Sequence, residues 1–313
     1  MNSTCLVIGG NGFIGKNLVF GLLEEGFEVY VVDKFITNYE DYQHPKLHLS
    51  EGDINDTAAV AALAKKVTHV VWLIHTTVPS TSMADVEHDL QSNVPPLIKF
   101  IQEIKKIETI THFLYLSSGG TVYGDPVEFK PIDENFKKDP ISSYGLTKLI
   151  AEEYINFLLR ESPIHAFILR PSNVYGRYQN LNKPQGIIGH IFKSALNNTS
   201  LSIYGDGSII RDYIHVIDLC RAIVMCLLSD LGAKRPLTVN IGSGIETSIN
   251  EMLYLTGKTM GADVVHEKLP DRGFDCQYNV LSIDLCTNEL GWKPEITLEA
   301  GLSDVWLWIQ ENR

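Results

Sequence analysis

The feature that most constrains the fold of this chain is the alternation of short apolar runs with helical stretches through its first half. Several of these runs are hydrophobic throughout rather than at every second residue, which is typical of strands covered on both faces of a sheet. Strands that alternate with helices form parallel sheets through right-handed crossovers. The sequence therefore predicts an α/β fold with a doubly wound parallel sheet. The predicted strands span residues 5–10, 27–33, 46–53, 68–75, 111–117 and 165–171, and the predicted helices span 13–25, 57–65, 94–106 and 144–161.

The alternation weakens after Pro171. Glycine, asparagine and proline cluster in residues 173–189, and the later elements are shorter. We therefore expect residues 1–172 to form the main domain and residues 173–313 to form mostly a smaller substrate domain. A helical stretch at 216–228 is expected to return to the main domain. No repeat, low-complexity tract or long linker separates the two parts, so they should pack as one unit.

Composition limits the partners and the compartment. The net charge of −12 would repel nucleic acid, so a nucleic-acid partner is not expected. No run approaches the ~20 apolar residues of a membrane span, and the first strand has no basic flank or cleavage site of a signal peptide before it. The cysteines show neither a C-x-x-C pair nor zinc-site spacing, which predicts no metal and suits a reducing compartment. We expect a cytoplasmic protein without a membrane partner, and its cysteines are Cys5, Cys220, Cys226, Cys276 and Cys286.

The segment "GGNGFIG" is a candidate phosphate-binding loop. It places Gly9, Gly12 and Gly15 at three-residue spacing between the first strand and the first helix. Glycine permits a tight turn and lets backbone amides approach a pyrophosphate at the positive end of a helix. Glycine-rich turns are common, so the position of the loop matters more than the pattern. The loop residues predicted to bind the cofactor are Gly9, Gly12, Phe13 and Ile14.

The cofactor predicted from the following strands is NAD. Asp33 ends the second strand, about 20 residues beyond the loop, where a carboxylate accepts hydrogen bonds from the adenosine ribose. The same carboxylate repels the 2′-phosphate of NADP, although the neighbouring Lys34 weakens this effect. Asp53 and Ile54 follow the third strand, where the adenine ring would lie; a simple turn aspartate is the alternative for Asp53.

Tyr144 and Lys148 are the candidate catalytic pair. They lie four residues apart on a predicted helix and therefore share one helix face. Free tyrosine has a pKa near ~10, and lowering that pKa by ~3 units requires ~4 kcal/mol. A lysine ammonium and a positively charged nicotinamide ring in a dehydrated cleft could supply this energy. A tyrosine and a lysine that share a helix face by chance are the alternative.

The chain resembles the extended short-chain dehydrogenases, and specifically the NAD-dependent sugar epimerase/dehydratase family typified by UDP-glucose 4-epimerase. The matching motifs occur in the family's order and cover nearly the whole chain. This resemblance implies a Rossmann-type domain with a smaller C-terminal substrate domain. The motifs are "GGNGFIG" (9–15), "SSGGTVYG" (117–124), "YGLTK" (144–148), "RPSNVYG" (170–176), "YGDG" (204–207) with "RDYIHV" (211–216), "NIGSG" (240–244) and "GWKP" (291–294).

The resemblance implies a role for each matching residue. Tyr144 would be the general base for the sugar 4-hydroxyl, while Lys148 would hold the nicotinamide ribose and tune Tyr144. Asn93 corresponds to the family asparagine that lies beside the cofactor. Residues of the second half would contact a nucleotide-diphosphate sugar, which we expect to be UDP-linked; they are Asn173, Ser202, Tyr204, Arg211, Arg272 and Asp275.

Arg211 and Arg272 also suit this role on physical grounds. A diphosphate is bound best by forked, permanently charged donors, and an acidic protein needs such local cations to bind a doubly charged ligand. A surface salt bridge is the alternative for either arginine.

The chain departs from the family pattern near the catalytic tyrosine. A serine or threonine that shares the proton is usual at the position of Gly119, so we expect Ser118 or Thr121 to replace it, with Thr121 preferred. Dehydratases carry an Asp-Glu pair where this chain has Gly120 and Thr121, so dehydration lacks its acid and base, and glucuronate decarboxylation, which uses a related glutamate, is disfavoured too. In the fourth strand "WLIHTTVPS" replaces the usual His-Leu-Ala-Ala, and His75 is expected beside the cofactor.

The predicted activity is C4 epimerisation with NAD, of the UDP-glucose/UDP-N-acetylglucosamine 4-epimerase type. A 4-keto-sugar-nucleotide reductase is the main alternative, and Asp33 disfavours the NADPH that many such enzymes prefer. A non-catalytic protein that senses NAD or a sugar nucleotide is a third possibility, which the presence of both Tyr144 and Lys148 disfavours.

Two further expectations follow from the resemblance. Asn279 would lie beside the sugar C2 substituent, where its small side chain would admit an N-acetyl group and hydrogen-bond its carbonyl. The alternative is that Asn279 caps a turn and that Tyr278 blocks the pocket. The helices at 94–106 and 144–161 are expected to pair with their copies in a homodimer, although both carry exposed charges.

Overall fold

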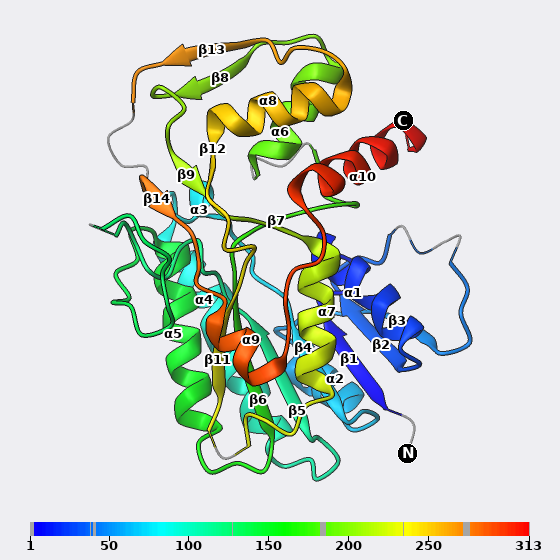
Figure 1. Cartoon of the computed structure of the whole chain (residues 1–313). Coiled ribbons are helices and arrows are strands. Elements are labelled where there is room, and N and C mark those ends of the chain that lie inside the picture. The colour runs from blue at the N-terminus through cyan, green and yellow to red at the C-terminus, as the bar shows by residue number, and fades with distance from the viewer. Residues whose placement is uncertain are drawn as a thin grey trace.

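The main body of the protein is a seven-stranded parallel sheet in the order β11-β6-β5-β4-β1-β2-β3 (Figure 1). The computed structural model describes residues 3–37, 39, 42–126, 128–181, 186–233, 235–271 and 276–312. Strand order runs outward in both directions from β1, so the predicted doubly wound α/β class is confirmed. The strands are β1 (Thr4–Ile8), β2 (Glu28–Asp33), β3 (Leu47–Glu51), β4 (His69–Trp72), β5 (His112–Leu116), β6 (His165–Pro171) and β11 (Leu237–Ile241).

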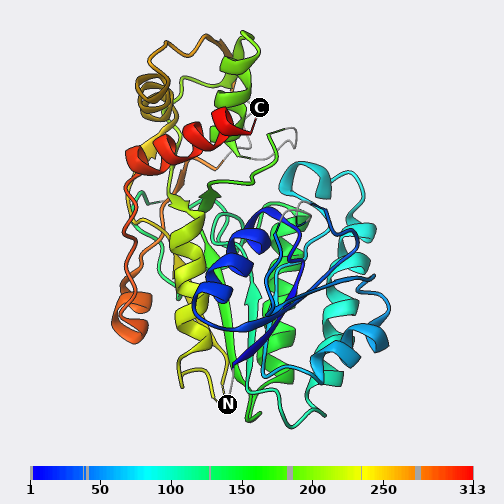
Figure 2. The ribbon, with the colours of Figure 1, turned by 90° about the vertical axis from the view of Figure 1, so that its right-hand side faces the viewer.

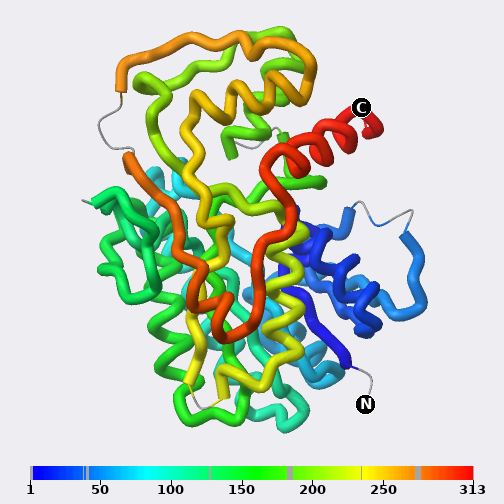
Figure 3. The backbone as a smooth tube through the Cα atoms, in the orientation of Figure 1, coloured from blue at the N-terminus to red at the C-terminus, as the bar shows by residue number. Residues whose placement is uncertain are grey.

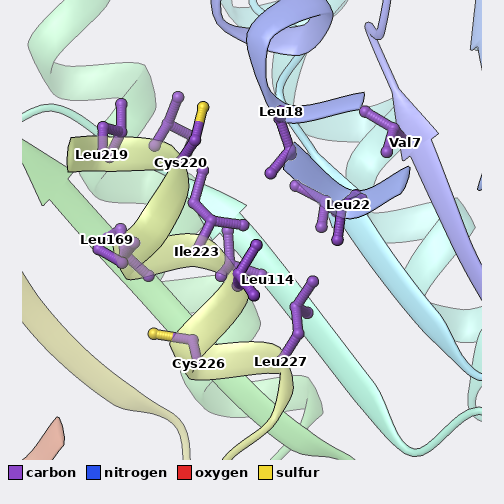
Figure 4. Close-up of a cluster of buried hydrophobic side chains, with 14 of the residues drawn as sticks. Val7, Leu18, Leu22, Leu114, Leu169, Leu219, Cys220, Ile223, Cys226 and Leu227 are labelled. Carbon is purple, nitrogen blue, oxygen red and sulfur yellow. The ribbon is translucent and has the colours of Figure 1, made fainter. Parts of the chain in front are cut away.

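Helices cover both faces of this sheet. On β1, Cys5 and Val7 belong to a core shared with α1 and α7, whereas Leu6 and Ile8 belong to the core shared with α2, α4 and α5. Figure 4 shows part of the first of these cores, with Val7 next to α1 and the leucines of α7 packed beside the sheet. Burial on both faces explains why the strands are apolar throughout. The helices are α1 (Phe13–Glu24), α2 (Thr57–Ala64), α4 (Val86–Ile104), α5 (Ser143–Leu158) and α7 (Val216–Leu227), and a short α3 (Pro79–Ser82) precedes α4.

Helix α4 is longer than the sequence predicted. It begins at Val86 rather than Val94, so the prediction was wrong at this end. Asp85 caps the true start, where its side chain accepts a hydrogen bond from the amide of His88 at 2.9 Å. Pro95 and Pro96 lie inside the helix. Proline is favoured in the first helical turn, which made the pair look like a helix start.

The second half of the chain forms a smaller lobe above the carboxyl ends of the main strands (Figures 1 and 2). Three short sheets and three helices pack there around a separate apolar core. The chain also returns to the main body: β11 is an edge strand of the large sheet, α7 packs on α1, and α9 (Asp284–Leu290) lies beside β11, as the tube in Figure 3 allows the reader to follow. The lobe contains β7 (Asn173–Tyr175), β8 (Leu201–Tyr204), β9 (Ile210–Arg211), β10 (Tyr213–His215), β12 (Thr247–Ser248), β13 (His266–Leu269), β14 (Tyr278–Asn279), α6 (Ile187–Leu196), α8 (Ile249–Met260) and α10 (Leu298–Glu311).

None of the helices in the described part of the chain is long and apolar enough to cross a membrane.

Candidate active site

The glycine loop between β1 and α1 has the shape that a dinucleotide site requires. Gly9 has a φ of 88°, in the region that favours glycine. A Cβ on Gly15 would lie 2.3 Å from the carbonyl oxygen of Gly9, so α1 approaches the loop because residue 15 is glycine. Gly12 is the N-cap and makes no side-chain hydrogen bond to the first turn, which Phe13 and Ile14 begin. The positive end of α1 is therefore suited to the pyrophosphate of NAD.

Asp33 lies beside this loop at the end of β2. Its Oδ2 accepts a hydrogen bond from the amide of Asn11 at 3.0 Å, and its Oδ1 accepts one from the amide of Lys34 at 2.8 Å. The carboxylate is thus fixed where the ribose of NAD would be held. Asp53 accepts a hydrogen bond from the amide two residues later at 2.8 Å, which is a turn, and Ile54 is buried in the core on the α2 face.

Helix α5 places the predicted catalytic pair next to the end of β5. Ser142 caps this helix, and its side chain accepts a hydrogen bond from the amide of Gly145 at 3.2 Å. Lys148 is buried, and its Nζ lies 5.7 Å from the centroid of the Tyr144 ring. The same Nζ donates a hydrogen bond to the carbonyl oxygen of Leu116, the last residue of β5, at 2.6 Å. The parallel sheet and α5 together therefore bring the pair to the edge where such folds bind ligands.

Burial moves the pKa values of the pair in opposite directions. The pKa of Tyr144 is raised to about 12 by burial and by the charge of Asp89, while a hydrogen bond with the side chain of Ser118 lowers it. Burial lowers the pKa of Lys148 to about 7, against the influence of Glu152 and Asp89. Both shifts favour the uncharged forms, so a nearby positive charge is needed to bring Tyr144 to its phenolate.

The hydroxyl beside Tyr144 belongs to Ser118. Thr121 was preferred from the sequence, but its Oγ1 is buried and has no hydrogen-bond partner among the described residues. Gly119 has no room for the usual serine, because a Cβ there would lie 2.6 Å from Cδ1 of Leu281 and 2.9 Å from the carbonyl oxygen of Arg170. Packing against Leu281 thus explains why residue 119 is glycine rather than the usual serine or threonine. The geometry favours Ser118 over Thr121 as the hydroxyl that shares the proton of Tyr144.

A network of buried polar side chains lies next to Lys148 on the side of Glu152. The sequence did not predict this network. Glu152, one turn after Lys148, forms a buried ion pair with Arg170 and accepts a hydrogen bond from Ser117. Arg170 Nη1 donates to the Tyr123 hydroxyl at 2.8 Å, and that hydroxyl donates to Asn240 Oδ1 at 2.7 Å. Except for Glu152, these residues all lie in the recognised motifs, so the motifs themselves were the signal that could have found the network.

Asn93 and the segment after β4 form the other wall of the site. Asn93 Oδ1 accepts a hydrogen bond from the amide of Thr76 at 2.8 Å, and its Nδ2 donates to the backbone oxygen of Asp89 at 2.7 Å. His75 is buried with its ring centroid 4.4 Å from that of Tyr144. His75 therefore lies against the candidate catalytic tyrosine, and Asn93 is connected to this region through Asp89, which no sequence pattern singled out.

The smaller lobe contains a cavity of about 260 Å³. The guanidinium of Arg211 donates hydrogen bonds to the backbone oxygens of Ile210 and Cys276 at 2.8 and 2.6 Å, and within the described residues it makes no ion pair. This arrangement leaves its charge for a ligand rather than for a surface salt bridge. Arg272 and Asp275 lie outside the described residues. The predicted substrate residues that line the cavity are Asn173, Ser202, Tyr204 and Arg211.

Asn279 is buried beside Gly119 rather than exposed in a turn. Its Nδ2 donates a hydrogen bond to the Gly119 carbonyl oxygen at 3.1 Å, and its Oδ1 has no partner among the described residues. The side chain of Tyr278 makes other contacts: its hydroxyl donates a hydrogen bond to Glu246 at 2.9 Å, and its ring stacks on Phe129. The Oδ1 atom of Asn279 is an acceptor, which suits the N–H of an acetamido group better than its carbonyl.

The comparisons with known proteins agree with this geometry. Residues 5–242 match the model of the NAD dependent epimerase/dehydratase family. A putative UDP-glucose 4-epimerase of Methanocaldococcus jannaschii is 35% identical over 98% of each chain. The UDP-glucose 4-epimerase of Thermotoga maritima, solved with UDP-glucose, has a TM-score of 0.90 at 28% identity over 99% of each chain. MoeE5, solved with UDP-glucuronic acid and NAD, has a TM-score of 0.89 at 25% identity over 99% of this chain and 100% of that one.

These matches extend over most of the sequence and include the glycine loop, the Tyr144–Lys148 pair and the network behind it. The chain belongs to the NAD-dependent epimerase/dehydratase family.

Proposed function

We propose that the protein is an epimerase that inverts C4 of a nucleotide-diphosphate sugar with an NAD that stays bound between turnovers. The observation that carries this proposal is the pair formed by half-buried Tyr144 and buried Lys148 at the edge of the sheet, next to a glycine loop that fits NAD. Gly120 and Thr121 supply no carboxylic acid to drive loss of water. The names of the relatives support a UDP-linked sugar.

In this mechanism Tyr144 takes the proton of the sugar 4-hydroxyl and later returns it. NAD held by the glycine loop and Asp33 would supply a reversible hydride acceptor, so that C4 becomes a ketone, and reduction of the other face of the turned 4-keto sugar would give the inverted epimer. For Tyr144 to act at neutral pH, its pKa of about 12 must fall, at ~1.4 kcal/mol for each unit. A protonated Lys148 and the hydrogen bond with Ser118 both act in that direction.

The two lobes would bind different ligands. We propose that residues 1–172, together with α7 and β11, hold NAD and that most of residues 173–313 hold the nucleotide sugar. The cavity lined by Arg211 supports this division, because a diphosphate needs a permanently charged donor there. Arg272 and Asp275 are proposed to complete the site from the segment before β14.

Asn279 is proposed to admit an acetamido group on the sugar C2, so UDP-N-acetylhexosamines would be substrates. Support comes from its small size and from its Oδ1, which has no partner within the described part of the chain. The test compares kcat/KM for UDP-glucose and UDP-N-acetylglucosamine in the wild type and in Asn279→Tyr. We expect the variant to lose at least about tenfold, or about 1.4 kcal/mol, on the acetamido substrate and to spare the hexose. Equal losses on both substrates would contradict the assignment.

The protein is further proposed to be a cytoplasmic homodimer. Apolar side chains stand exposed on the outer faces of α4 and α5, among them Val86, Leu90, Tyr154 and Phe157. Exposed apolar side chains on two helices that pack together support burial against a second copy. The cysteines of the described residues are all free thiols, which supports a reducing compartment.

The proposed reaction is tested by the cofactor that purifies with the protein. The purified protein is denatured, and the supernatant is assayed for NAD. Copurified NAD, together with interconversion of the two C4 epimers without added cofactor, is the expected result. A protein that releases no NAD and instead consumes added NADH or NADPH with a 4-keto sugar nucleotide would be a reductase.

A further inference from the structure

A buried carboxylate next to the catalytic tyrosine has no role in the mechanism described above. Asp89, on α4, has no exposed surface. Its Oδ2 accepts hydrogen bonds from Ser143 Oγ at 2.6 Å and from Thr147 Oγ1 at 3.1 Å, both on α5. Its Oδ1 accepts hydrogen bonds from Thr77 and from the side chain of Asn93. The carboxylate therefore ties α4 and the segment after β4 to the first turns of α5, on either side of Tyr144, and its charge is stabilised by these donors.

His75 lies between this carboxylate and Tyr144. Its Nε2 is 3.4 Å from Asp89 Oδ1, and its ring meets the Tyr144 ring edge-on at an interplanar angle of 69°. The side chain is 6% exposed, and neither ring nitrogen makes a hydrogen bond to a described residue. Burial and the charge of Lys148 lower the pKa of His75 to about 2, so the ring is neutral. A neutral ring carries one N–H, and the adjacent carboxylate favours the tautomer with that hydrogen on Nε2.

We propose that His75 and Asp89 are positioning residues for Tyr144: the His75 ring fixes the orientation of the phenol, and the Asp89 charge sets the pH at which the phenol becomes a base. Neither residue belongs to the motifs that define the family resemblance. The inference rests on the proposed function only in taking Tyr144 as the base.

The direction of the effect follows from the charges that face Tyr144. Lys148 on α5 favours the phenolate when protonated, while Asp89 on α4 opposes it. His75 after β4 and Tyr115 on β5 are the other titratable groups nearby, and burial raises the pKa of Tyr115 well above its ordinary value. Both are therefore uncharged. The charges of Asp89 and Lys148 thus act in opposite directions on the pKa of Tyr144.

The charge of Asp89 is tested with Asp89→Asn, and Glu87→Gln is the matched control. Glu87 is an exposed carboxylate on the same helix. The acid limb of kcat/KM against pH should move by about half a pH unit or more toward lower pH in Asp89→Asn and stay in place in the control. The titration of Tyr144 is also followed by ultraviolet difference absorbance in the NAD-loaded protein, with Tyr144→Phe as the reference, and it should move in the same direction.

The absorbance titration needs no substrate, so it tests the pair even if the proposed reaction proves to be another one. A fall in kcat with both the acid limb and the absorbance titration unmoved would mean that Asp89 has a structural role alone, which overturns the proposal. A titration that moves toward higher pH in Asp89→Asn would overturn it as well, because the proposal requires that removal of the charge that raises the Tyr144 pKa favours the phenolate.

The ring of His75 is tested with His75→Ala and His75→Phe. Phenylalanine keeps an aromatic edge against Tyr144, whereas alanine removes it. We expect His75→Ala to lower kcat by about tenfold or more with little change in KM, and His75→Phe to recover most of the loss. Equal losses in the two variants, or a loss confined to KM, would overturn the role of the ring.

Discussion

At the scale of single residues, Gly119 shows how packing decides which group can assist the chemistry. The Leu281 side chain and the Arg170 carbonyl occupy the space into which a side chain at residue 119 would project. The hydroxyl that lowers the pKa of Tyr144 therefore comes from the preceding residue, Ser118. Gly120, in contrast, faces open space, since a Cβ there would meet nothing closer than Ser118 Oγ at 3.9 Å.

This difference predicts opposite responses of two adjacent glycines. Gly119→Ala should lower the free energy of unfolding by about 1–3 kcal/mol, because the new methyl group overpacks against Leu281 and a backbone oxygen. Gly120→Ala is the control and should change it by less than about 0.5 kcal/mol. Urea denaturation of both variants measures the difference. Equal effects at the two positions would show that Leu281 does not determine residue 119.

Tyr144→Phe is the residue-scale test of the base. The substitution removes one oxygen and keeps the ring that packs against His75. We expect kcat to fall by about 10² or more while the protein still binds NAD, because the proton acceptor alone is lost. Steady-state kinetics and cofactor content after denaturation measure the two properties. A variant that keeps more than about a tenth of the wild-type kcat would exclude Tyr144 from this role.

At the scale of elements, three adjacent strands begin with stacked histidines. His69, His112 and His165 stand in register on β4, β5 and β6, with ring centroids 4.5 and 4.9 Å apart. Each ring contacts a backbone oxygen of the segment that joins α7 to β11, at residues 227, 229 and 231. This ladder therefore fastens the edge strand β11 to the end of the sheet opposite the active site.

The ladder predicts loss of stability in acid. Burial, together with the two flanking histidines, lowers the pKa of His112 to about 4. The unfolded chain, whose histidines have pKa values near ~6.5, then binds more protons than the folded one below that pH. The contribution of the ladder is full above pH ~6.5 and is lost as the pH falls toward about 4. His112→Gln should flatten the decline of Tm over this window, whereas the exposed His266→Gln should leave it unchanged; an equally steep decline in all three proteins would refute the ladder.

Structural elements and site residues could be predicted where the residues that identify them lie close together in the sequence. Tyr144 and Lys148 were singled out because four residues separate them on one helix and because "YGLTK" matches the family, and Gly9 and Asp33 because the strands around them are short and apolar. The start of α4 was misplaced because its proline pair imitates a first turn, and Asp85 gave a weaker signal. Asp89 could not be found in this way, because its donors come from three segments that only the folded chain brings together.

At the scale of the whole molecule, the predicted boundary at residue 172 separates two parts of the sequence but does not separate the two lobes in space. Residues after 173 build the smaller lobe, but β11, α7 and α9 complete the main sheet and its cover. The sequence predicted that the helix at 216–228 returns to the main domain, but it did not predict the return of β11. A five-residue strand at a sheet edge has too little local pattern to reveal its partner.

The exposed apolar side chains of α4 and α5 predict assembly into a dimer. Phe157 and Tyr154 on α5 are 70% and 42% exposed, and Val86 and Leu90 stand on the neighbouring α4. Exposure of these apolar side chains to water is unfavourable, and pairing α4 and α5 with their copies would bury them. Light scattering at micromolar concentration should give about twice the mass of the chain, and Phe157→Glu should shift the population toward monomer, because the charge would have to be buried without a partner. Glu153→Gln, a change at an exposed position of the same helix, is the control and should remain a dimer. A wild-type monomer, or a Phe157→Glu protein as dimeric as the control, would mean that this face serves another purpose.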